Sequence, residues 1–247
     1  MGGSIRVGIG GWTFEPWRGT FYPEGLAHKR ELEFAASVLT TIEINGTYYS
    51  TFKPASWRKW RQEAPDGFKF AVKASRYCTN RKVLAEAGPS VERFLAQGLV
   101  ELGDSLGPIN WQFMATKKFD YDDFAAFLDM LPPRLGGLPL THALEVRHAS
   151  FSDERFITLA RERHIAIVVA EGEDVPRIEA PTAGFTYARI MTSREDVPDG
   201  IAPREISAIA KTCRTWARGG DVYAYFIAGA KQRNPAAAQA LLRALAK

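Results

Sequence analysis

The feature that most constrains the fold is a regular alternation of two kinds of segment along the whole chain. Short apolar runs rich in β-branched and aromatic residues alternate with longer segments whose apolar residues recur with helical period. The predicted strands cover residues 5–12, 41–49, 69–75, 109–114, 142–148, 166–171, 185–190 and 221–227. The predicted helices cover residues 30–39, 54–64, 90–104, 121–131, 152–164, 203–218 and 235–246.

This alternation predicts an α/β fold, a single (β/α)8 TIM barrel with eight parallel strands. The chain has 247 residues, which suits one such barrel, and it contains no linker or low-complexity stretch, so we expect one domain over residues 1–247. A doubly wound open sheet is the alternative. Thr13 stands where a dinucleotide-binding loop after the first strand would need its third glycine, and we expect no cofactor.

The cysteine content and the apolar runs of the sequence indicate the cellular compartment of the protein. The two cysteines, Cys78 and Cys213, lie far apart in the sequence and no Cys/His cluster is present, which argues against a disulfide framework or a zinc finger. The N-terminus lacks the apolar core of a signal peptide, and no apolar run approaches the ~20 residues of a membrane span. We therefore expect a cytoplasmic protein with no membrane partner. Its oligomeric state is left open.

Polar residues interrupt the predicted strands on one parity only, usually near the C-terminal end. Glu43 and Asn45, for example, alternate with Ile42 and Ile44. Because successive side chains of a strand point to opposite faces, we expect the aliphatic parity to pack on the helices and the polar parity to point into the barrel. The active sites of such barrels lie at the C-terminal mouth, so these residues predict a site there.

The predicted site combines acidic, basic and aromatic side chains. The predicted catalytic residues are Glu43, Glu145, Glu171 and Lys73. The predicted substrate-binding residues are Trp12, Trp17, Asn45, Tyr48, Arg76, Gln112, Arg147, His148, Arg189 and Tyr225. Burying so many charges only to stabilise a barrel is unfavourable, because desolvating each ion costs several kcal/mol. A functional site therefore explains these charged residues at the strand ends better than a purely structural network of ion pairs does.

Several of these segments together resemble the DUF72 family, also called the YecE-like family, of TIM-barrel proteins. The matching stretches are GIGGW at 8–12, WRGTFYP at 17–23, EINGTYY at 43–49, PDGFKFAVK at 65–73, EVRH at 145–148, YARI at 187–190 and VYAYF at 222–226. The resemblance implies a TIM barrel and implies no particular reaction. The chain departs from the family pattern after strand eight, where Ile227 and Ala228 replace two asparagines, and at Glu171, where Asp is common.

The residue types favour an enzyme acting on a small anionic, phosphorylated or carboxylated, sugar-like substrate. Arginine and lysine bind phosphate and carboxylate, and a pair of glutamates can supply a general acid and base. Lys231, in the segment after the last strand, occupies a position where barrels often bind phosphate.

Three alternatives remain open. The first is a metal-dependent hydrolase with Glu43, Glu145, Glu171 and His148 as ligands, although no metal motif is present and we expect no metal. The second is a nucleic-acid-binding protein that uses the basic clusters at 58–61 and 76–82, which a formal net charge of +4 supports only weakly. The third is a non-catalytic ligand-binding barrel.

Overall fold

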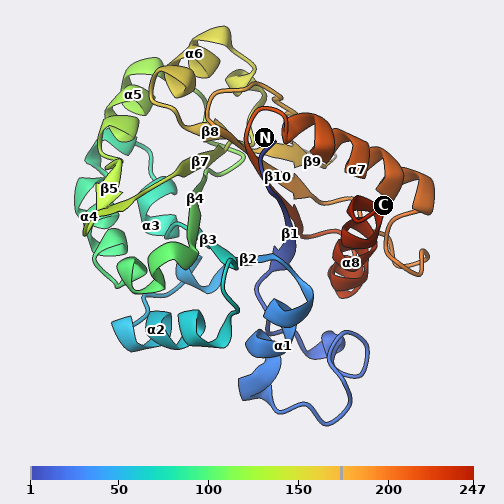
Figure 1. The fold of residues 1–247 in the computed structure, drawn as a ribbon. Helices are drawn as coiled ribbons and strands as arrows, with labels where there is room; N and C mark the ends of the chain where they lie inside the picture. The colour runs from blue at the N-terminus through green and yellow to red at the C-terminus, as the bar shows by residue number, and fades with distance from the viewer. Residues whose placement is uncertain (1, 173–174) are drawn as a thin grey trace.

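The computed structural model describes residues 2–172 and 175–247, and its centre is a parallel sheet rolled into a barrel with helices around it (Figure 1). The strands of this sheet are β1 (Ile5–Gly10), β2 (Thr41–Ile44), β3 (Lys69–Lys73), β4 (Leu106–Gln112), β7 (His142–Glu145), β8 (Ala166–Ile167), β9 (Val169–Glu171), β10 (Phe185–Ile190) and β11 (Asp221–Phe226). They pair in the order β8-β7-β4-β3-β2-β1-β11-β10-β9, and every pair is parallel. The predicted TIM barrel is confirmed.

The sheet has nine strands rather than the predicted eight, because the segment 166–171 changes its neighbour at Val168. Its first half, β8, pairs with β7, and its second half, β9, pairs with β10. The Val168 amide still donates to the carbonyl of Leu144 on the β7 side, at 3.0 Å. One continuous segment therefore bridges the two ends of the sheet and nearly closes the barrel, with the register offset that tilted barrel strands require.

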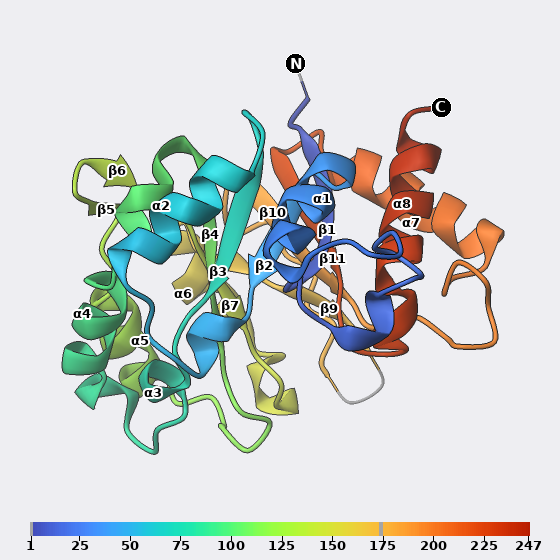
Figure 2. The same cartoon turned by 90° about the horizontal axis from the view of Figure 1, so that it is seen from below.

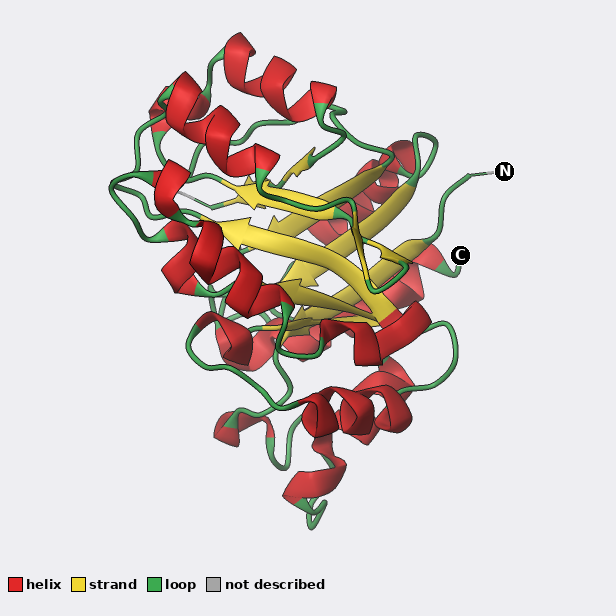
Figure 3. Cartoon of the chain, turned by 90° about the vertical axis from the view of Figure 1, so that its left-hand side faces the viewer, coloured by secondary structure: helices red, strands yellow, loops and turns green. Residues whose placement is uncertain are grey.

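Helices cover the outside of the barrel on all sides (Figures 2 and 3). They are α1 (Glu31–Val38), α2 (Pro54–Glu63), α3 (Arg76–Thr79), α4 (Gly88–Leu95), α5 (Tyr121–Asp129), α6 (Glu154–Glu162), α7 (Pro203–Trp216) and α8 (Asn234–Leu245). The shorter elements are 3₁₀ turns at Glu15–Trp17, His28–Arg30, Gly46–Tyr48, Leu84–Glu86, Leu99–Ser105, Ala149–Phe151 and Lys231–Arg233, and a small hairpin of β5 (Arg134–Leu135) and β6 (Leu138–Pro139). Within the described residues, none of the helices combines the length and apolar character that crossing a membrane requires.

The two largest differences from the predicted elements are a strand and a helix that end early. The strand predicted over 41–49 ends at Ile44, because the chain turns into a 3₁₀ segment that begins at Gly46. The helix predicted over 90–104 is broken at Gly98, whose φ of +117° is a left-handed conformation that favours glycine. A Cβ at Gly98 would lie 2.9 Å from the Trp57 ring of α2, so close packing of α2 also requires glycine there.

The barrel interior and the helix-facing layer form two separate apolar clusters. The interior cluster consists of Ala71, Ala143, Ala166, Val168, Tyr187, Tyr223 and Tyr225. Small residues from one side of the barrel leave space for large tyrosines from β10 and β11 on the other, and the Tyr187 and Tyr225 ring centroids lie 5.0 Å apart. This plug fills the lower interior, as side-chain layers do in such barrels, and supports the charged residues one step further along the strands.

Candidate functional site

The floor of the C-terminal mouth is a buried charged cluster supplied by the ends of four strands. Glu43 comes from β2, Asn110 from β4, Glu145 from β7 and Arg189 from β10, and each is at least 98% buried. Their side chains share the interior parity of the strands, as the period of two predicts. The structure thus brings together residues that lie up to 146 positions apart in the sequence.

Glu145 is the most heavily bonded member of the floor. Nη1 of Arg189 lies 2.6 Å from each of its carboxylate oxygens, and Nη2 of Arg147 donates to Oε1 at 2.7 Å. Gln112 donates to Oε1 at 2.6 Å, and Asn110 donates to Oε2 at 3.0 Å. Burial alone would raise the pKa of Glu145, but Arg189 and Arg147 outweigh it and hold that pKa well below its ordinary value. Glu145 therefore stays ionised, and its fixed charge positions the surrounding donors rather than exchanging protons.

Glu43 has three donors of its own. The hydroxyl of Tyr187 and the amide of Asn110 donate to Oε2, the latter at 3.3 Å, and Nη2 of Arg189 donates to Oε1 at 3.2 Å. Burial, together with the Glu43 carboxylate, raises the pKa of Tyr187 well above its ordinary value, so the phenol keeps its proton and acts as a donor. Arg189 links the two carboxylates of the floor.

Lys73 differs from its neighbours because none of the hydrogen bonds or ion pairs within residues 2–172 and 175–247 involves its ammonium. The ammonium lies over the ring of Tyr48, 4.4 Å from its centroid, and the residue is only 9% exposed. Burial is the main cause that lowers the pKa of Lys73 to about 8, and the positive charge of Arg189 lowers it further. A fraction of this amine is therefore neutral at physiological pH.

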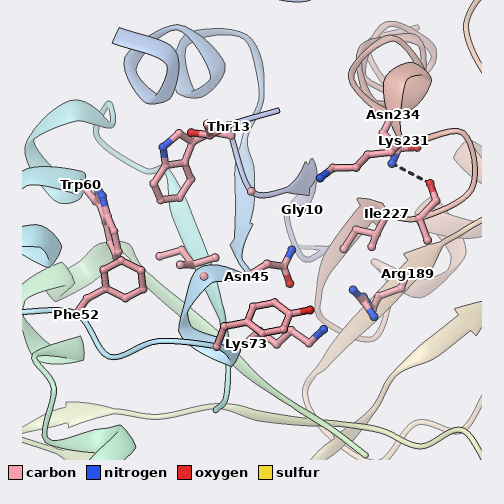
Figure 4. A pocket seen from close by; sticks show the side chains of 16 residues that line it. Gly10, Thr13, Asn45, Phe52, Trp60, Lys73, Arg189, Ile227, Lys231 and Asn234 are labelled. Atoms are coloured by element: carbon pink, nitrogen blue, oxygen red, sulfur yellow. Dashed lines mark hydrogen bonds between the residues drawn. The ribbon is translucent and has the colours of Figure 1, made fainter. Parts of the chain in front are cut away.

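Above the floor lies a cavity of about 480 Å³ at the C-terminal ends of β1, β2, β3, β10 and β11 (Figure 4). The cations Lys73, Arg189 and Lys231 line it, together with Gly10, Gly11, Trp12, Thr13, Ile44, Asn45, Gly46, Tyr49, Phe52, Trp60, Ile227, Ala228 and Asn234. No carboxylate is among these lining residues, because Glu43 and Glu145 are sealed beneath them. The volume falls within the range of small-molecule sites.

Lys231 projects into the cavity from the loop after β11, a loop that two side chains hold in place (Figure 4). The indole of Trp17 donates to the Lys231 carbonyl at 3.1 Å, and Asn234 donates to the Ala228 carbonyl at 3.1 Å. The Lys231 ammonium lies 4.2 Å from the ring centroid of Phe14, and partial burial lowers its pKa. Lys231 is exposed to solvent, and its ammonium lines the cavity and contacts the Phe14 ring.

Aromatic side chains form one wall of the cavity. The rings of Trp12 and Trp60 meet edge to face with centroids 5.3 Å apart, and Phe52 packs on Trp60 at 5.0 Å. These residues come from the loop after β1, the loop before α2, and α2 itself. The wall presents an apolar aromatic surface beside the three cations.

Asn45 and Gly10 meet at the cavity floor. A Cβ at Gly10 would lie 2.6 Å from Nδ2 of Asn45 and 3.2 Å from Ile227, so any larger residue would displace the asparagine. The Oδ1 of Asn45 is buried and has no donor among the described residues. Asn45, two residues after Glu43, thus sits in the cavity lining, and only glycine fits against it.

Several predicted site residues lie outside the cavity lining. Glu171 shares the outward parity of Val169 and pairs with Arg177 at 2.6 Å on the helix side of the sheet, so its placement in the mouth was wrong. Tyr225 is buried in the interior plug below the floor, where it bonds Thr41 at 2.8 Å.

His148 bonds the hydroxyl of Ser150 at 2.9 Å and caps the following 3₁₀ turn, because the strand has already ended at Glu145. Trp17 is fully buried under the Lys231 loop. Gln112 donates a hydrogen bond to Glu145, and the Tyr48 ring lies against the Lys73 ammonium, so both residues contact the floor without lining the cavity. The exposed Arg76 has its guanidinium 5.8 Å from the centroid of the Tyr49 ring.

The structure also bears on the alternatives of a metal site and of a nucleic-acid-binding surface. The four ligands considered for a metal do not gather, and no cluster of three His, Cys, Asp or Glu suited to a metal occurs within the described part of the chain. In the basic cluster at 58–61, Arg58 pairs with Glu101 at 2.8 Å and Arg61 with Asp66 at 2.9 Å. These ion pairs offset the charge of that surface.

The predicted site residues did not include four residues that the structure places at the site. Asn110 and Tyr187 share the inward parity of Gln112 and Arg189, so the period of two contained the signal for both. Phe52 and Trp60 belong to the cavity wall, yet nothing in their local pattern distinguishes them from core residues.

Comparison with known proteins agrees with the observed fold. The model of a family described as "Protein of unknown function DUF72" matches residues 6–247. A DUF72 family protein from Thermotoga maritima MSB8 is 20% identical with a TM-score of 0.79, covering 99% of this chain and 100% of that one.

A DUF72 family protein from Enterococcus faecalis V583 is 15% identical with a TM-score of 0.77, covering 98% of this chain and 96% of that one. A D-psicose 3-epimerase is 14% identical with a TM-score of 0.54, covering 98% and 97%. No curated protein matches the sequence. At these identities the structural likeness shows the fold alone.

Proposed function

The chain belongs to the DUF72 family, and from that premise we propose that it is an enzyme whose substrate is a small anionic molecule bound at the C-terminal mouth of the barrel. The observation that carries the proposal is the lining of the mouth cavity, which contains Lys73, Arg189 and Lys231 and no carboxylate. Three cations around an otherwise largely apolar space attract a negatively charged ligand and make it more favourable than a neutral one.

The two glutamates of the floor support the cations rather than compete with a ligand. Their carboxylates are saturated by donors from below and from the side, so they keep Arg189 in place without entering the cavity. A phosphate or carboxylate takes its charge-assisted hydrogen bonds from the cavity side. The wall of Trp12, Phe52 and Trp60 suits the flat or ring-shaped remainder of such a ligand.

Lys73 is the group best suited to proton transfer. An efficient general base has a pKa near the working pH, and burial lowers the pKa of Lys73 to about 8. Glu145 fits that role less well, because its cationic neighbours keep it ionised. The proposed division of labour therefore gives anion binding to Lys231 and Arg189 and the proton to Lys73, with Glu43 and Glu145 as positioning residues.

The test compares anionic ligands with uncharged ones. We expect D-ribose 5-phosphate, 3-phosphoglycerate or inorganic phosphate to raise the melting temperature and D-ribose and glycerol to leave it unchanged. Lys231→Met should weaken anion binding roughly 10- to 150-fold, because a hydrogen bond to a charged group contributes ~1.5–3 kcal/mol. Lys211→Met, which removes an exposed cation on α7, is the matched control. The proposal fails if no anion of the panel binds, or if the two variants behave alike.

A further inference from the structure

Lys73 stands beside two carboxylates and pairs with neither. Both carboxylates are occupied, Glu145 by donors from Arg189, Arg147, Gln112 and Asn110. Glu43 is occupied by donors from Tyr187, Asn110 and Arg189. The Lys73 amine is consequently left on the face of the Tyr48 ring at the cavity floor, where Figure 4 shows it directed toward Arg189.

A lysine that served only to attract an anion would be placed where its charge is favoured. Lys73 is placed where the charge is disfavoured, because burial and the guanidinium group of Arg189 outweigh the attraction of Glu43 and Glu145. Arg189 and Lys231 already provide positive charge to the same cavity. The arrangement costs stability although two other cations already attract an anion to the cavity, which indicates that the neutral amine is the useful form.

The backbone that carries Lys73 is rigid. It is the last residue of β3, and its carbonyl accepts a hydrogen bond of 2.6 Å from the hydroxyl of Thr47. A nucleophile held on a strand end, with its nitrogen at the edge of a small-molecule cavity, meets the positional requirement for covalent catalysis. The cations of the cavity would hold the anionic end of a ligand while a second group of that ligand faces the amine.

We infer that Lys73 forms an imine with the carbonyl group of an anionic aldehyde or ketone bound in this cavity, an inference that rests on the proposed function and names its substrate class. The lone pair of the neutral Nζ forms a bond to the carbonyl carbon, and the carbonyl oxygen takes up a proton to give a carbinolamine. That oxygen then leaves as water after a second protonation, both protons of the original amine are given up in these steps, and a neutral imine of Lys73 remains. No oxidant or reductant takes part.

The resulting imine, once protonated, is an electron sink beside the fixed anions of the floor. Its positive charge would replace that of the lysine ammonium and meet the same carboxylate field from Glu43 and Glu145. Such a group accelerates bond breaking next to the former carbonyl carbon. The class of reaction implied is addition, cleavage or isomerisation adjacent to a carbonyl.

The test traps the imine by reduction. The full-length protein is incubated with pyruvate, glyoxylate or dihydroxyacetone phosphate, treated with sodium borohydride, digested and analysed by mass spectrometry. With pyruvate, the peptide that contains Lys73 should gain the mass of pyruvic acid less one oxygen atom. Labelling should be lost in Lys73→Arg and Lys73→Met and retained in Lys211→Arg. It should increase as the pH rises through about 8, where Lys73 loses its proton.

Matched ligands separate this inference from the proposed function. L-lactate has the charge of pyruvate and no carbonyl group, and acetone has the carbonyl group and no charge. Binding of pyruvate and L-lactate by calorimetry without any borohydride label on Lys73 would overturn the imine and leave the anion site standing. Absence of both binding and label would overturn both proposals. Equal labelling of surface lysines, unchanged in Lys73→Arg, would also overturn the imine, as would acetone labelling Lys73 as well as pyruvate does.

Discussion

Arg189 donates from a single nitrogen, Nη1, to both carboxylate oxygens of Glu145 at 2.6 Å, and neither side chain is more than 3% exposed. The two residues come from β10 and β7, which are separated in the sheet by the segment that divides into β8 and β9. The ion pair therefore spans the barrel interior just where the sheet closes. It links the architecture of the barrel to the chemistry of its mouth.

Removing the charge of Glu145 should be strongly destabilising. Glu145→Gln keeps the shape of the side chain but leaves Arg189 as a buried cation with one remaining carboxylate, Glu43. We expect a loss of about 3–5 kcal/mol in the free energy of unfolding, measured by urea denaturation. Glu101→Gln, which removes the exposed partner of Arg58, should cost less than about 1 kcal/mol. Similar losses in the two variants would contradict the assignment of Glu145 to the floor.

The difference between wild type and Glu145→Gln should depend on pH. The pKa of Glu145 lies below its ordinary value of 4.5 in the folded protein, so its ionisation stabilises the fold fully above that pH. As the pH falls below about 4.5, the unfolded chain takes up the proton first and this stabilisation declines. Urea denaturation at several pH values between 6 and 3 should show the two proteins converging. A constant gap over that range would rule out a depressed pKa.

Lys73→Met should raise stability at neutral pH. The pKa of Lys73 falls from 10.5 to about 8 on folding, so the charged form is disfavoured in the fold below pH 8. Methionine removes that penalty, and we expect a gain of roughly 2–4 kcal/mol at pH 7. Between pH 8 and 10.5 the wild-type penalty is relieved, because the unfolded chain alone still binds the proton, and the gain should shrink. Thermal or urea unfolding across this range measures it, and a variant less stable than wild type at pH 7 would refute the burial argument.

Gly10→Ala should damage the cavity floor. The added Cβ would lie 2.6 Å from Nδ2 of Asn45, which must move into the ligand space. We expect a stability loss of about 1–3 kcal/mol and weaker binding of D-ribose 5-phosphate. Gly184→Ala is the control, because no atom lies within 4 Å of the added methyl group. Calorimetry on both variants measures the effect, and unchanged binding in Gly10→Ala would remove Asn45 from the site.

Glu171→Gln should leave ligand binding intact. Glu171 pairs with Arg177 on the helix side of the barrel, outside the cavity lining. The ion pair is partly exposed, so the change in stability should stay within about 1 kcal/mol. A dissociation constant for D-ribose 5-phosphate that differs from wild type by tenfold or more would return Glu171 to the site.

Local patterns in the sequence determined the strands, the helices and most of the floor. The alternation along 185–190 placed Tyr187 and Arg189 on the inner face, and the same reasoning placed Glu43 and Glu145 there. The face of the sheet to which a side chain points can be predicted from the sequence where polar and apolar residues alternate. The run 166–171 is apolar up to its last residue, so it carried no contrast, and the orientation of Glu171 was decided by the pairing of β9 with β10.

Only the tertiary structure decided which donors each carboxylate receives and which loops form the cavity. Glu43 and Arg189 are 146 residues apart, and the wall and the Lys231 loop come from opposite ends of the chain. A period of two or 3.6 residues describes which way a side chain faces within its own element. Closure of the barrel sets the distances between elements, and those distances left the Lys73 amine without a carboxylate partner among the described residues.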